Sequence, residues 1–179
     1  MMRAARARRR SAEYSFRTRW VLDAAPARCW GELERSITGA SPPWWPGMTI
    51  VTPAVRLAPG ERVRIEVRAP LGYTLRCDLR LTQVGAARTL AARSEGDLAG
   101  DGGVDIRSCD RGTEIRFRWD VAVRKRWMRV LSPVLRPVFA LAHGRVMRAG
   151  ERGLRRALGS GVRKPVNPAP RAGSGAPAR

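Results

Sequence analysis

Alternation of apolar and arginine-rich positions dominates the middle of the chain. It is clearest in four runs, at 13–22, 61–69, 73–84 and 113–123. Because successive side chains of a strand point to opposite faces of a sheet, each run predicts a strand with one apolar and one basic face. Three weaker runs bring the expected number of strands to seven, at 48–57, 88–96 and 103–108. The pattern is typical of an antiparallel sheet that is wet on one side and covered on the other.

Two segments have helical periodicity instead. The first, APARCWGELERS at 25–36, opens with Pro26 at an early helical position, where proline is tolerated. The second spans roughly 125–158, and we expect Pro133 and Pro137 to interrupt or kink its beginning. One stripe of this long helix is charged and consists of Arg145, Arg148, Arg152, Arg155 and Arg156. The opposite, mostly apolar stripe contains Phe139, His143, Met147, Gly150 and Leu154.

A long helix with one apolar stripe must bury that stripe against the apolar face of the sheet. The order of elements therefore predicts an α+β fold with a hollow between sheet and helix. We expect one domain over 13–158, between a basic tail at 1–12 and a Pro/Ala/Gly-rich tail at 159–179. Neither tail has enough large apolar residues to offset the entropy of ordering, so we expect both to be disordered.

The chain is strongly basic, with 35 Lys and Arg against 15 Asp and Glu and a net charge of +20. Two explanations stay open: a GC-rich coding sequence, or selection for an acidic partner such as nucleic acid or anionic lipid. Cys29, Cys77 and Cys109 form no Cys-x-x-Cys motif, and their odd number argues against a disulfide framework. With no secretory signal at the N-terminus and no spanning apolar segment, we expect a cytoplasmic protein.

Several stretches resemble one known family when taken in order. They are WWPG at 44–47, PLGYTLRCDLRLT at 70–82, EGDLAGDG at 95–102, and the segment from Gly112 to Leu158. Together they resemble the SRPBCC (START and birch-pollen-allergen-like) superfamily, and within it the bacterial polyketide cyclase/dehydrase-type branch. The resemblance implies a helix-grip fold, in which a seven-stranded antiparallel sheet wraps around a long C-terminal helix, with short helices between strands 1 and 2. It also implies an apolar cavity, but it does not imply a reaction.

The segment SPPWWPGMT at 41–49 places two adjacent tryptophans among three prolines. In an extended segment adjacent side chains point in opposite directions, so we expect one of Trp44 and Trp45 to pack inward and the other outward. One ring would then fill the core beneath the first helix, and one could line the mouth of a cavity.

His143 is the only histidine and lies at the centre of the apolar face of the long helix. It is either a core histidine bonded to a neighbour or a polar group that orients a ligand or transfers a proton. Tyr14 and Tyr73 are the other polar groups expected to point inward. The candidate ligand-binding residues are Tyr14, Trp44, Trp45, Ile65, Tyr73, Leu75, Cys77, Phe117, Trp119, Phe139, His143 and Met147.

Other chemistry is weakly supported. The chain has no second histidine to share a metal and no Gly-x-Ser-x-Gly motif, so we expect no metal site and no cofactor. Gly96, Gly100, Gly102 and Gly103 do not have Walker-loop spacing, and a bulged hairpin explains them better. Departing from the family pattern, DGGVDI at 101–106 lacks an aromatic residue near Gly103 or Val104.

Three functional interpretations follow. The main one is binding, and conversion if the site is catalytic, of a small hydrophobic, aromatic, polyketide-like or lipid-like molecule. The second is a polyketide cyclase or dehydratase with His143 as proton shuttle. The third is a basic surface adaptor for anionic membrane or nucleic acid; weak membrane contact is favoured over nucleic acid, because the aromatic residues point away from the basic face. The sequence leaves open a monomer or a homodimer, and a cavity that is open or filled by Trp20, Phe117, Trp119 and Phe139.

Overall fold

The computed structural model describes residues 13–68, 72–85, 87–124 and 132–160. These residues form seven strands and two helices, in the order β1 (Glu13–Leu22), α1 (Pro26–Ile37), β2 (Met48–Thr52), β3 (Arg62–Arg68), β4 (Thr74–Gly85), β5 (Thr89–Gly96), β6 (Leu98–Cys109), β7 (Gly112–Val123) and α3 (Ser132–Ser160). The tails at 1–12 and 161–179 and the first residues of the expected long helix, 125–131, lie outside the described residues. No described helix is long and apolar enough to span a membrane.

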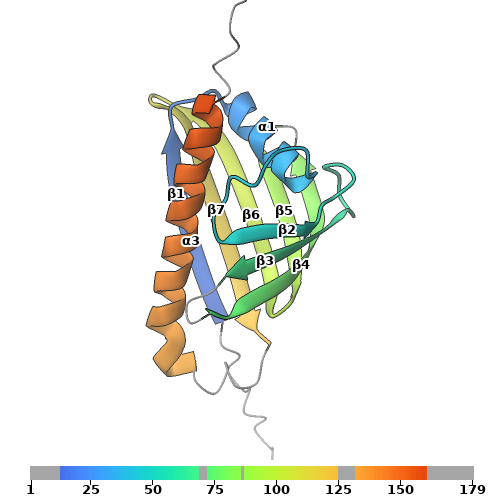
Figure 1. Cartoon of the computed structure of the whole chain (residues 1–179), viewed down its shortest axis with the longest axis vertical. Coiled ribbons are helices and arrows are strands. Elements are labelled where there is room, and N and C mark those ends of the chain that lie inside the picture. Colours follow the sequence, from blue (N-terminus) through green and yellow to red (C-terminus); the bar gives the residue numbers. More distant parts are fainter. Residues whose placement is uncertain (1–12, 69–71, 86, 125–131, 161–179) are drawn as a thin grey trace, which may run out of the picture.

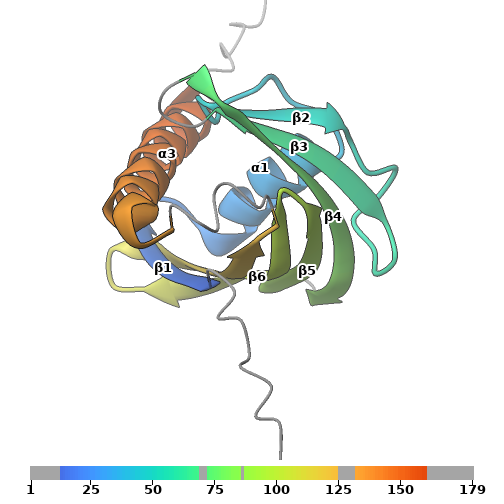
Figure 2. The same cartoon turned by 90° about the horizontal axis from the view of Figure 1, so that it is seen from below.

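All seven strands form one antiparallel sheet in the order β1-β7-β6-β5-β4-β3-β2. The sheet curls strongly, so that its two edge strands approach α3 from opposite sides, as Figure 2 shows from below. Figure 1 shows α3 running along β1, while α1 crosses one end of the curl. The expected α+β architecture is confirmed, with the single helix α1 between β1 and β2.

The alternation predicted from sequence is confirmed where it is clearest. Along β1 the inward positions Tyr14, Trp20 and Leu22 are buried, whereas Arg17 and Arg19 are exposed. At the end covered by α1, a packed core joins the sheet to both helices through Trp20, Leu22, Cys29, Leu33, Trp44, Ile106, Ile115, Met147, Leu154 and Leu158. This end of the curl is therefore filled.

The structure differs from the predictions at several points. β2 ends at Thr52, whereas the expected strand ran to 57. The glycines at 100, 102 and 103 lie inside β6, which begins at Leu98, and the β5–β6 register runs without a shift from Thr89↔Asp105 to Ser94↔Gly100. The expected hairpin is present, since β5 and β6 are antiparallel and joined at Asp97. The expected bulge is not found in it; the register shifts lie in the β2–β3 and β4–β5 pairs instead. Pro137 lies inside α3, which continues through it from Ser132 to Ser160, so the expected interruption at this residue is not found.

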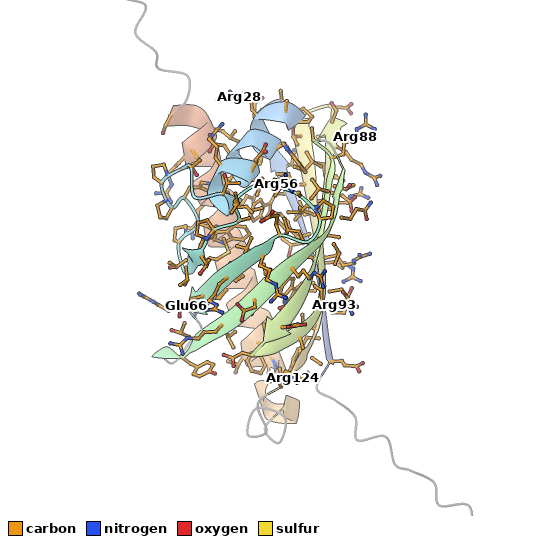
Figure 3. All side chains as sticks on the ribbon, turned by 90° about the vertical axis from the view of Figure 1, so that its right-hand side faces the viewer. Arg28, Arg56, Glu66, Arg88, Arg93 and Arg124 are labelled. Carbon is orange, nitrogen blue, oxygen red and sulfur yellow. The ribbon has the colours of Figure 1, made fainter. Side chains whose placement is uncertain are left out.

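Carboxylates balance the arginines on the outer face of the sheet. Directly paired residues of neighbouring strands form ion pairs: Arg64 with Asp78, Arg76 with Glu66, and Arg93 with Asp101. Figure 3 shows Glu66 and Arg93 on this outer face. Such exposed pairs contribute little to stability because solvent screens them, but they neutralise part of the arginine charge on the strands.

Two further carboxylates on β7 bind arginines of β1. Asp120 accepts hydrogen bonds from Arg17 and Ser15, and the Arg17 hydrogen bonds lower the pKa of this carboxyl. Glu114 accepts from Arg19 and Arg116, and Arg19 is the main cause of its lowered pKa. Both carboxylates therefore stay ionised at neutral pH and hold β1 to β7 on the outer face.

The two tryptophans pack against α3 together. Their rings stack on each other with centroids 5.4 Å apart and planes 19° apart, and the Trp45 indole N–H donates to the Val146 carbonyl at 2.9 Å. The prediction that one ring points outward is therefore wrong: the segment is a bend between α1 and β2 and not a strand, so side chains need not alternate. Gly150 and Gly153 make room for the pair, because a Cβ at Gly150 would overlap the Trp45 ring.

We expect Gly153→Ala to lower the free energy of unfolding by about 1–3 kcal/mol, as overpacking does. A Cβ at this position would overlap the backbone carbonyl oxygen of Trp44, which cannot move without shifting the loop. Urea denaturation measures the effect. Gly144→Ala is the matched control on the same helix, since its nearest neighbour is the flexible Arg148 side chain at 3.4 Å; it should stabilise by up to about 1 kcal/mol. Equal effects of the two substitutions would contradict close packing at Gly153.

Candidate ligand cavity

An apolar cavity of about 290 Å³ lies between the inner face of the sheet and α3. Its volume is close to the lower end of the range for small-molecule sites, roughly 300–1,000 Å³. Every strand contributes to its wall, α1 contributes Leu33, Ser36 and Ile37, and α3 contributes Phe139, Ala142, His143, Val146 and Met147. The long helix thus supplies one complete side of the cavity.

Small residues on the middle strands keep this space empty. Ala92 on β5 is the register partner of Gly102 on β6, and Gly102 is the partner of Trp119 on β7. A Cβ at Gly102 would overlap the six-membered ring of Trp119. Because Gly102 has no side chain, the indole lies against the β6 backbone and forms part of the wall instead of crossing the interior. The glycine stretch that lacks the aromatic residue of the family pattern therefore shapes the cavity.

Eleven of the twelve candidate residues line the cavity: Tyr14, Trp44, Trp45, Ile65, Leu75, Cys77, Phe117, Trp119, Phe139, His143 and Met147. Tyr73 is the exception, because its hydroxyl lies 3.2 Å from an Asp97 carboxylate oxygen and its ring packs beside the cavity. That these eleven residues bind a ligand stays a prediction. Sequence reasoning missed Phe16 and Val146 as wall residues, although Phe16 belongs to the inward set of β1 and Val146 follows His143 by one helical turn.

His143 is the titratable side chain at the centre of the α3 wall. Its Nε2 lies 3.2 Å from the Thr18 hydroxyl of β1, and its ring stacks on Phe16 with centroids 4.2 Å apart and planes 13° apart. Burial lowers the pKa of the imidazole from its ordinary value of 6.5, so the ring is neutral at pH 7. A neutral imidazole has one donor and one acceptor nitrogen, and can therefore hydrogen-bond a ligand or transfer a proton.

Aromatic rings close the end of the cavity nearest α1. The Trp20 ring packs on Phe117 at 4.3 Å and on Trp45 at 5.2 Å. Trp20 itself is 1% exposed and belongs to the filled core, whereas Phe117, Trp119 and Phe139 form the wall. The large rings therefore border the cavity without filling it, which decides between the two alternatives that the sequence left open.

The buried thiols are poor nucleophiles. Burial raises the pKa of both Cys29 and Cys77, so both are protonated at neutral pH. Across the described ranges, no group of three or more His, Cys, Asp or Glu side chains is placed to hold a metal ion. Among the titratable side chains that line the cavity, His143 is the one whose pKa lies closest to neutral pH. The Thr18 hydroxyl is its hydrogen-bond partner and is not itself a lining residue.

Neither a family model nor a curated protein matches the chain, but solved structures share its fold. The Zhui aromatase/cyclase from Streptomyces sp. R1128 is similar over 85% of this chain and 97% of its own, with 16% identity and a TM-score of 0.65. Protein TTHA0849 from Thermus thermophilus matches over 84% and 100%, with 13% identity and a TM-score of 0.66. Ara h 8.0201 matches over 83% and 99%, with 13% identity and a TM-score of 0.58. The helix-grip fold implied by the SRPBCC resemblance is thereby confirmed.

We expect the lowered pKa of His143 to appear directly in an NMR titration, since the chain has a single histidine. Its imidazole resonances should titrate below pH 6.5 in the folded protein. The unfolded chain then binds more protons than the folded one, so the stability contributed by this group rises with pH. This contribution to stability is lost as the pH falls from about 6.5 through the pKa of His143 in the folded protein. A titration at or above 6.5 would contradict burial of the neutral ring.

Proposed function

We propose that the protein binds a small hydrophobic or aromatic molecule, of the polyketide or lipid type, in the cavity between the sheet and α3. The observation that carries the proposal is an apolar space of about 290 Å³ with one neutral histidine in its wall. A space of this kind stays available for an apolar guest, because few polar groups are present to hold water in it.

The wall supplies two kinds of affinity. Burial of apolar ligand surface contributes about 25 cal/mol per Å² before the costs of association. The rings of Phe16, Phe117 and Trp119 offer faces and edges to a planar aromatic guest. His143 then supplies orientation, since a ligand hydroxyl or carbonyl can hydrogen-bond its imidazole. The apolar wall therefore selects ligands by shape, and His143 on α3 fixes where the polar end of the ligand lies.

Cyclase or dehydratase chemistry is the second candidate. The observation that favours it is the His143 imidazole, which is neutral, half-buried and 3.2 Å from the Thr18 hydroxyl. A base of this kind could remove a proton from a bound carbonyl compound and return it to an oxygen. Zhui and BexL, both named as aromatase/cyclases, share the fold at 16% and 15% identity. Similarity at this level does not transfer their activity.

Reducing the cavity should abolish binding while leaving the fold intact. We expect Ala142→Leu to weaken binding of the neutral probe N-phenyl-1-naphthylamine at least 10-fold, because Ala142 lines the cavity and three added carbons occupy it. Ala140→Leu is the control, with the same substitution at an exposed position on the same helix. Probe fluorescence titration gives both dissociation constants. Equal affinities of the two variants, or no binding by the wild type, would contradict a ligand site in this cavity.

His143→Ala separates binding from catalysis. If the protein only binds, the variant should retain the probe within about 10-fold, since one hydrogen bond contributes about 0.5–1.5 kcal/mol. If it also catalyses, the variant should keep the molecule that co-purifies with the wild type but should no longer convert it. Native mass spectrometry, followed by organic extraction, identifies that molecule and its product. Undiminished conversion by the variant would exclude His143 as the proton shuttle.

A further inference from the structure

The arginines of this protein differ in their partners. On the sheet, Arg17, Arg64, Arg76 and Arg93 each pair with a carboxylate, whereas Arg62, Arg80 and Arg107 form no ion pair with a described residue. On the outer face of α3, Arg145, Arg148, Arg152 and Arg156 form no ion pair with any described residue. All 15 acidic residues of the chain lie within the described ranges, so no other Asp or Glu exists to neutralise this face.

The unpaired arginines form a straight row. From Leu141, the steps of four, three, four and four residues lead through Arg145, Arg148 and Arg152 to Arg156, which places all five on one side of the helix. The row is about 22 Å long at 1.5 Å per residue. Arg148, Arg152 and Arg156 repel one another at spacings of four residues, and Arg152 and Arg156 donate only weak hydrogen bonds to backbone carbonyls, at 3.3 and 3.4 Å.

A GC-rich coding sequence favours arginine over lysine, yet it does not by itself align four arginines without a carboxylate partner along one helix. Glu151, the one acidic residue of α3, pairs with Arg155 instead. A face that served only for solubility would intersperse both signs, as charge pairs at helical spacing do on stable exposed helices. The repulsion along α3 therefore indicates an external partner of negative charge.

We infer that the outer face of α3, defined by Leu141, Arg145, Arg148, Arg152 and Arg156, docks onto an anionic lipid membrane. A row of arginines on an exposed helix face matches the phosphates of anionic headgroups. Each basic residue close to such a membrane surface strengthens binding about fivefold. Leu141 lies at one end of the row with 52% of its surface exposed, placed to enter the headgroup layer. The opposite face of the same helix carries His143, Val146 and Met147 in the cavity wall.

The surroundings of α3 argue against a nucleic acid as the partner. A helix enters the major groove only when it protrudes, because the groove is about 12 Å wide and takes most of the helix. Here α3 packs against β1 on one flank and α1 on another, and the Trp44–Trp45 pair contacts it at Gly150 and Gly153. None of the exposed positions of α3 between 137 and 160 carries an aromatic side chain that could stack on bases.

Sedimentation of the full chain with lipid vesicles tests the inference. The probes are vesicles of phosphatidylcholine alone and vesicles with 30% phosphatidylglycerol. The test variant is the triple substitution Arg145→Gln, Arg148→Gln and Arg152→Gln, which keeps helix propensity. The control variant is Arg62→Gln, Arg80→Gln and Arg107→Gln, which removes the same charge from exposed strand positions for which the structure shows no carboxylate partner among the described residues. Circular dichroism checks both folds.

We expect the wild type to bind only the anionic vesicles, and to release them as salt rises from 50 to 300 mM. The α3 variant should lose at least 10-fold in partitioning, and the strand variant at most about 2-fold. Both variants should bind the cavity probe as tightly as the wild type does. A failure of membrane docking can therefore be told apart from a failure of ligand binding in the cavity. Equal losses in the two variants, no binding by the wild type, or tighter α3-dependent binding to duplex DNA than to vesicles would overturn the inference.

Discussion

The fold depends on covering the apolar inner face of one strongly curled sheet. At one edge, β1 lies beside α3. At the other edge, the loop with the tryptophan pair connects the sheet to α3: the Gly47 carbonyl accepts the Arg68 N–H of β3 at 2.8 Å, and Trp45 donates to Val146 on the helix. The segment SPPWWPGMT therefore closes a ring of sheet, loop and helix. Gly150 and Gly153 are needed on α3 because side chains there would push this loop away.

The cavity results from an uneven distribution of side-chain size around that ring. Large rings gather on β1 and β7 and beneath α1, where Trp20, Phe117 and the tryptophan pair fill the core. Across the middle strands, small residues at Cys77, Ala92 and Gly102 alternate with larger lining residues such as Leu75 and Leu90. Trp44 and Trp45 fix the distance between α3 and the sheet. The helix therefore cannot move inward to fill the space that the small side chains leave. The protein thus keeps a space that well-packed interiors usually lack.

Sequence reasoning predicted the strands because the inward positions of β1, β3, β4 and β7 are apolar one after another. It placed the start of β6 too late, since Gly100, Gly102 and Gly103 have no side chains with which to alternate. It also misplaced the tryptophan rings, because their orientation depends on a hydrogen bond to Val146, 101 residues further along the chain. The alternation along 73–84 predicted that Tyr73 points into the cavity, but its hydrogen bond to Asp97 in the β5–β6 turn holds it beside the cavity. Local patterns carry no information on such distant partners.

One helical turn of α3 connects the candidate chemistry to the closure of the fold. His143, Val146 and Met147 all line the cavity, and the backbone carbonyl of Val146 is also the acceptor for Trp45. A shift of α3 along its axis would therefore change the tryptophan contact and the distance between His143 and Thr18 at the same time. The position of the only imidazole in the cavity is thus set from both sides, by β1 through Thr18 and Phe16 and by the loop through Val146. A polar group held in this way is preorganised, which is the physical requirement for orienting a ligand that otherwise meets an apolar wall.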